Sequence, residues 1–70
     1  MGTLVKALAD QAWYFNYDNL DKKVTIMFAG GTVVVRLIEG GYSTEFNGVL
    51  VAHLNVNSVL RYMNKMHSQA

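Results

Sequence analysis

The stretch "FAGGTVVVRLIEGGYSTEF", residues 28–46, places two glycine pairs ten residues apart with β-forming residues between them. Glycine readily adopts the positive φ that the primed two-residue hairpin turns require. If Gly30-Gly31 and Gly40-Gly41 are such turns, the residues between them form one strand, and each flank forms another. The spacing therefore predicts an antiparallel β-meander.

The two turns also predict a register. Centred on the first glycine pair, it places three apolar pairs on one face: Phe28 with Val33, Ile26 with Val35, and Val24 with Leu37. Centred on the second pair, it places Val35 opposite Phe46 on that same face. The other face then receives Arg36 opposite Glu45, a cross-strand pair of favourable sign. Because both turns select the same core face, the pattern favours a meander over unrelated loops.

The segment before the meander predicts a helix and then a loop. Thr3 is a suitable N-cap, and Leu4, Leu8, Ala12 and Phe15 recur at helical spacing. We expect the helix to continue to about Tyr14, while the aromatic run 13–17 is also compatible with an extended segment. Residues 16–23 are rich in Asn, Asp and Lys and predict a loop, in which Asp18 and Asp21 have turn and capping roles.

The segment after the meander predicts one more strand and a final helix. Asn47-Gly48 is a strong hairpin dipeptide, and residues 49–54 have a β-rich composition. Asn55 is a suitable N-cap for a helix with one apolar stripe through Val56, Val59, Leu60, Met63 and His67. The alternative is a helix from Val49 to Met66. The favoured fold class is α+β: an N-terminal helix, an antiparallel three- to four-stranded β-meander and a C-terminal helix, forming a single domain over residues 1–70.

Composition limits how this domain is stabilised and where it acts. A chain of 70 residues buries only about 60% of its unfolded surface, and without cysteine it has neither a disulfide nor a thiolate zinc site. It is 51% hydrophobic and only 16% charged, so we expect a homodimer to bury part of the apolar surface. No apolar run is long enough for a membrane helix, and the start has no signal-peptide core, so a cytoplasmic protein with no membrane partner is expected.

The face opposite the predicted core is unusually apolar for a solvated antiparallel sheet. By alternation it carries Met27, Val34, Ile38, Leu50, Ala52 and Leu54. Two short helices can cover one face of the sheet but hardly both, so a partner protein or a second copy is expected on this one. The predicted partner-binding residues are Met27, Val34, Ile38, Leu50 and Leu54, with Tyr14, Tyr17 and Tyr62 at the rim.

Catalytic, cofactor and metal sites are not indicated. His53 and His67 are the only histidines, and no HExxH, nucleophile-elbow or phosphate-loop motif is present. His53 falls in an apolar strand, which favours a structural or dimer-interface role. We therefore expect no enzyme, no cofactor and no metal.

The favoured function is a non-catalytic protein-binding or regulatory module that self-associates, by analogy with the small inhibitor or accessory proteins of phages. The alternative is a nucleic-acid-binding domain. For that role Trp13, Tyr14, Tyr17, Tyr42 and Tyr62 would supply stacking surfaces, and Lys22, Lys23, Arg36 and Arg61 the phosphate contacts. The order helix, strands, helix resembles the general layout of double-stranded-RNA-binding domains, but their basic cluster at the start of the last helix is missing. A net charge of +1 also disfavours this alternative.

Overall fold

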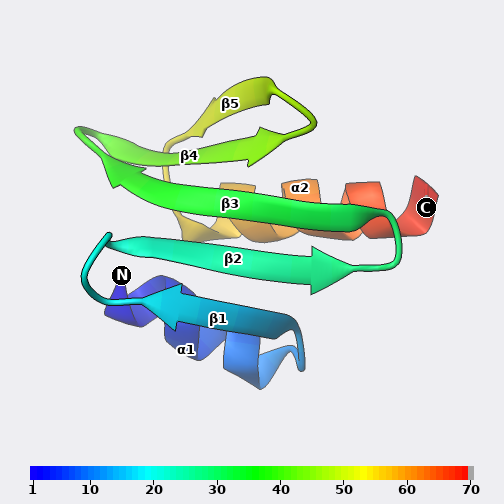
Figure 1. Ribbon diagram of the computed structural model, residues 1–70, viewed down its shortest axis with the longest axis horizontal. Helices are drawn as coiled ribbons and strands as arrows, with labels where there is room; N and C mark the ends of the chain where they lie inside the picture. The colour runs from blue at the N-terminus through cyan, green and yellow to red at the C-terminus, as the bar shows by residue number, and fades with distance from the viewer. Residues whose placement is uncertain (70) are drawn as a thin grey trace.

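The computed structural model describes residues 1–69 and has one five-stranded antiparallel sheet with a helix at each end of the chain (Figure 1). The elements are α1 (Gly2–Asp10), β1 (Tyr14–Asp18), β2 (Lys23–Phe28), β3 (Gly31–Ile38), β4 (Gly41–Phe46), β5 (Val49–His53) and α2 (Val56–Gln69). The strand order is β1-β2-β3-β4-β5, so every strand pairs with its sequence neighbour. The predicted α+β meander is confirmed, with one strand more than expected.

The extra strand, β1, corrects the prediction for residues 11–23. The helix begins at Gly2, ends at Asp10 and does not reach Tyr14, and half of the predicted loop is strand: residues 16–18 belong to β1 and Lys23 to β2. The reason is a Schellman-type cap: the N–H of Trp13 donates to the carbonyl of Leu8 at 3.0 Å, and that of Ala12 to Ala9 at 3.1 Å. Ala12 adopts φ +60° there, which turns the chain into β1.

Replacing Ala12 with glycine should therefore stabilise the protein. Alanine in the left-handed region costs about 1 kcal/mol, and glycine removes most of that strain, so we expect the free energy of unfolding to rise by about 0.5–1 kcal/mol. Urea denaturation measures the change. The matched control is Ala9→Gly, exposed inside α1, which should instead cost about 0.5–1 kcal/mol. Destabilisation by both variants would contradict this account of the cap.

The register differs from the prediction by two residues at both glycine pairs. The turns are Ala29-Gly30 and Glu39-Gly40, so Phe28 lies opposite Gly31 and Ile38 opposite Gly41. A shift of two preserves which side each residue faces, and the predicted core face is therefore correct.

The predicted cross-strand pairs are nevertheless wrong. Val33, not Val35, lies opposite Ile26. Arg36 lies opposite Ser43, and Glu45 lies opposite Val34, so the expected Arg36–Glu45 pair is absent from the register.

The second glycine of each pair belongs to a strand because another group lies against it. A Cβ on Gly31 would stand 3.1 Å from Cε1 of Phe46. A Cβ on Gly41 would overlap the carbonyl oxygen of His53, at the point where β5 lies against β4. The third turn matches the prediction: Asn47 and Gly48 have φ of +52° and +81°, as in a type I′ turn, and Phe46 lies opposite Val49.

The close approach at Gly41 predicts a large penalty for a side chain. Gly41→Ala should lower the free energy of unfolding by about 2 kcal/mol or more, because the overlapping group is backbone and cannot move aside. Gly48→Ala is the control, since its surroundings are open and its φ is also positive. It should cost only about 1 kcal/mol. Equal penalties in thermal or urea denaturation would argue against the overlap.

Both helices lie on one side of the sheet, behind it in Figure 1. We call this side the covered face and the other the open face. The fully buried core lies between the sheet and the helices and comes from four elements: Leu4 and Leu8 of α1, Val24 and Ile26 of β2, Val33 and Val35 of β3, and Val59, Leu60 and Met63 of α2. The side chain of Asn55 caps α2, because its Oδ1 accepts the N–H of Ser58 at 2.9 Å. Residues 49–54 thus precede the helix, and the predicted strand-then-helix order is confirmed.

Candidate functional site

Five of the eight predicted partner-binding residues lie on the open face, and a sixth, Leu54, directly follows β5. Tyr14, Met27, Val34, Ile38 and Leu50 occupy alternating positions that point away from the helices, as their register partners require. Tyr14 is 80% exposed and Leu50 is 68% exposed, whereas Val34 is half-buried among its neighbours. Leu54 follows β5 and lies beside Gly41, whose Cβ position is 3.1 Å from the Leu54 Cα.

These apolar residues do not form one continuous patch. The ladder aligns Asn16, Thr25, Val34, Glu45 and Leu50 in one row across the sheet, and Asp18, Lys23, Arg36, Ser43 and Ala52 in the next. Two largely polar rows therefore separate Tyr14 and Met27 at one end from Ile38 at the other. The prediction identified the side of the sheet, but the two-residue shift in register determined how the residues are spread over it.

The most concentrated apolar exposure lies at β5, one of the two edge strands of the sheet. Val49 is 58% exposed on the covered side, Leu50 is 68% exposed on the open side, and Leu54 just beyond the strand is 84% exposed. Residues 49–55 contain no charged residue and no proline. We call residues 49–54, including the side of β5 that faces away from β4, the β5 edge. Natural sheets usually protect such an edge with charge, proline or a covering element.

Two predicted rim residues lie elsewhere. Tyr17 points to the covered side with Phe15, because it pairs with buried Val24, and its hydroxyl lies 3.3 Å from Oδ1 of Asn19. Tyr62 is on α2, where its ring packs against His53 with centroids 5.1 Å apart. Neither residue borders the open face, so the proposed binding surface loses both.

His53 forms a polar cluster that sequence reasoning did not identify. Its Nε2 lies 3.0 Å from Thr44 Oγ1 on β4, and its Nδ1 lies 2.9 Å from Ser58 Oγ on α2. His53 and Thr44 are both buried. A neutral imidazole donates from one nitrogen and accepts at the other, and hydroxyls complement either arrangement. The cluster therefore joins β4, β5 and α2, a structural role that agrees with one of the two expected for His53.

Burial lowers the pKa of His53 below its ordinary value of 6.5. Among residues 1–69, the hydrogen-bond and ring partners of His53 are uncharged: Thr44 and Ser58 are neutral hydroxyls, and Tyr62 contributes a ring. Desolvation disfavours the imidazolium form, and the two hydrogen bonds do not compensate for it with a negative charge.

The lowered pKa of His53 predicts a pH-dependent stability. Between the pKa of folded His53 and 6.5, the unfolded chain binds more protons than the folded one, so the free energy of unfolding falls as the pH is lowered through this window. Above about pH 6.5 this contribution is fully present. Urea titrations from pH 7.5 to pH 5 measure it, since roughly these values bracket the titration of histidine. His53→Gln should flatten the slope, whereas His67→Gln, on the exposed end of α2, should retain it; equal slopes in wild type and His53→Gln would contradict the assignment.

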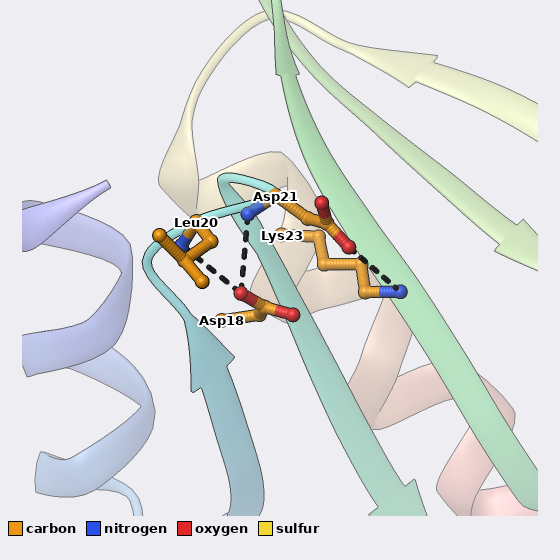
Figure 2. Close-up of polar contacts among 4 residues, drawn as sticks. All are labelled: Asp18, Leu20, Asp21 and Lys23. Atoms are coloured by element: carbon orange, nitrogen blue, oxygen red, sulfur yellow. Dashed lines mark hydrogen bonds and ion pairs between the residues drawn. The ribbon is translucent and has the colours of Figure 1, made fainter.

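The β1–β2 connection explains the acidic residues of the predicted loop. Figure 2 shows Oδ1 of Asp18 accepting the backbone N–H groups of Leu20 and Asp21, at 3.0 and 3.1 Å. Asp21 lies 3.8 Å from Nζ of Lys23 across this turn. These contacts fit the turn roles predicted for Asp18 and Asp21, and they leave Leu20 exposed at the tip.

Three shallow hollows of about 290–450 Å³ lie around the C-terminal half of α2 and the turn ends of the sheet. Their lining is mostly aromatic and apolar. Phe28 lines both the first and the second hollow, and Phe46 and Met66 line both the second and the third. His53, Thr44 and Ser58 line none of these three, although Tyr62, which packs against His53, lines one of them. Within residues 1–69, no three His, Asp or Glu side chains are grouped as metal ligands, and no helix is long and apolar enough to cross a membrane.

No protein-family model, curated protein or solved structure matches this chain. The geometry of the open face and of the β5 edge is therefore the basis for assigning a function.

Proposed function

We propose that the chain is a non-catalytic, cytoplasmic protein-binding or regulatory module, which self-associates and works through the uncovered parts of its sheet. The observation that carries this proposal is the placement of both helices on one face. Within residues 1–69, nothing covers the open face or the outer side of β5. The protein's most distinctive surfaces are thus ones that a second polypeptide would fit.

Energetics support an association of this kind. A large apolar side chain contributes about 1.5–3 kcal/mol when it moves from water into a packed interface. Val49, Leu50 and Leu54 are all more than half exposed and lie within six residues of one another. Burying them would add an amount comparable to the ~5 kcal/mol net stability of a marginal domain. A small accessory or inhibitor protein of phage type remains the closest analogy.

The distribution of aromatic and basic residues favours protein over nucleic acid as the partner. Lys23 and Arg36 are neighbours on the open face, but the only tyrosine on that face is Tyr14, in another row. Three of the remaining aromatic candidates serve packing: Trp13 lies against His67, Tyr62 against His53, and Tyr42 against the core. Tyr17 lies near one candidate cation, because its hydroxyl and Nζ of Lys22 both contact Oδ1 of Asn19. The candidate rings and cations are thus mostly on different surfaces. Single-strand binding requires the two together.

Self-association is tested by measuring molecular mass against concentration. We expect the mass from light scattering or sedimentation to rise from 7.8 kDa toward twice that value as the concentration increases. Passage through heparin and single-stranded DNA columns at low salt, without retention, should accompany it. A constant mass of 7.8 kDa together with salt-sensitive retention would reverse the preference and favour nucleic-acid binding.

A further inference from the structure

Building on the proposed self-association, we infer that a second copy of this chain docks on the β5 edge, pairing antiparallel with β5 about a two-fold axis at Val51 and extending the sheet to ten strands. The occupant follows from the chemistry of the edge. A row of unpaired backbone donors and acceptors is a template for another extended strand, whereas an apolar surface alone would accept many shapes.

The β4–β5 turn identifies the free backbone groups. In a two-residue hairpin the residues flanking the turn, Phe46 and Val49, form a hydrogen-bonded pair, and such pairs alternate along the ladder. The N–H and C=O groups of Val49, Val51 and His53 therefore point toward β4. Those of Leu50 and Ala52 point away from β4. β5 lies at the top of Figure 1, and no other element lies beyond it.

The side chains are compatible with self-pairing about Val51. This register places Leu50 opposite Ala52 of the second copy, a large residue beside a small one, and Val49 opposite His53. None of these residues is charged, so no like charges meet. Pairing about Val51 aligns the row that contains Glu45 with the second copy's row that contains Arg36 and Lys23, so opposite charges share a row. A register centred on Leu50 would instead align the Glu45 rows of the two copies, so like charges would share a row.

The two edges of the sheet also differ in how well they suit pairing. β1 carries Asp18, and α1 contacts its covered side. Pairing β5 with β1 of another copy would leave one of each edge free and could continue without limit, whereas β5–β5 pairing closes after two chains. A five-residue edge gives a small interface, so the dimer should be weak.

Amide hydrogen exchange tests the arrangement on the intact chain, at concentrations from about 10 to about 500 µM, chosen for a weak interface. As the mass doubles, the amides of Leu50 and Ala52 should become protected. Those of Val51 and His53 should be protected at every concentration, because they pair with β4. This alternation, in which the amides of Leu50 and Ala52 gain protection on association while those of Val51 and His53 are always protected, is specific to edge pairing. Rapid exchange at Leu50 and Ala52 in a sample of doubled mass would overturn the inference while leaving the proposed self-association intact.

Matched variants give a second, independent test. Ala52→Pro removes an outward N–H at an edge position where proline is tolerated, and Leu50→Lys adds a protecting charge. Each should weaken association about tenfold or more, whereas Ala52→Ser, which keeps the N–H, should change it by less than about threefold. Circular dichroism and the amide spectrum establish that each variant is folded.

Val34→Lys, opposite Glu45 on the open face, should leave the mass doubled; loss of association in Val34→Lys but not in Ala52→Pro would place the interface on the open face instead. A monomer at every concentration would overturn the self-association and, with it, the edge pairing.

Discussion

One-sided burial determines the architecture of this protein. All nine fully or nearly buried apolar residues lie between the helices and the covered face, and the four sheet residues among them come from β2 and β3 alone. Because a small chain has few such residues to distribute, packing α1 and α2 on the same side leaves the other side without a layer. The exposed apolar residues of the open face and of β5 are a direct consequence of that choice.

The β4–β5 hairpin is held differently from the rest of the sheet. It contributes no fully buried apolar side chain; its two buried residues are Thr44 and His53. The hydrogen bonds of His53 to Thr44 and Ser58 supply a directional link between this hairpin and α2, while Tyr42 and Phe46 pack at the border of the core. A histidine whose pKa is lowered by burial therefore lies at the junction beside the β5 edge, so its protonation acts on the link between this hairpin and α2.

Sequence reasoning predicted the faces of the sheet better than its pairs. Misplacing each turn by one residue shifted the register by two, and because alternation has a period of two, Val24, Ile26, Val33 and Val35 stayed on the correct side. The predicted cross-strand pairs were wrong because tertiary contacts decide whether a glycine closes a turn or belongs to a strand. Gly31 lies against Phe46, and Gly41 lies against the backbone of His53. The end of α1 was missed for a related reason: Ala12 occupies a left-handed position where glycine would have been a recognisable signal. Of the predicted binding surface, Met27, Val34, Ile38 and Leu50 follow from parity. The positions of Tyr14 and Tyr17 depended on the unpredicted β1, and that of Tyr62 on the orientation of α2.

The unbroken order of the strands has a consequence for how the chain acquires its structure. Each ladder is closed by a connection of two to four residues, so every hairpin can form from chain segments already close together, and rapid folding is expected. Val59, Leu60 and Met63, however, come from α2, after all five strands. During synthesis the part of the covered face that packs against α2 would remain exposed until residues 56–69 have emerged, and for that interval it would be accessible to chaperones or to neighbouring nascent chains.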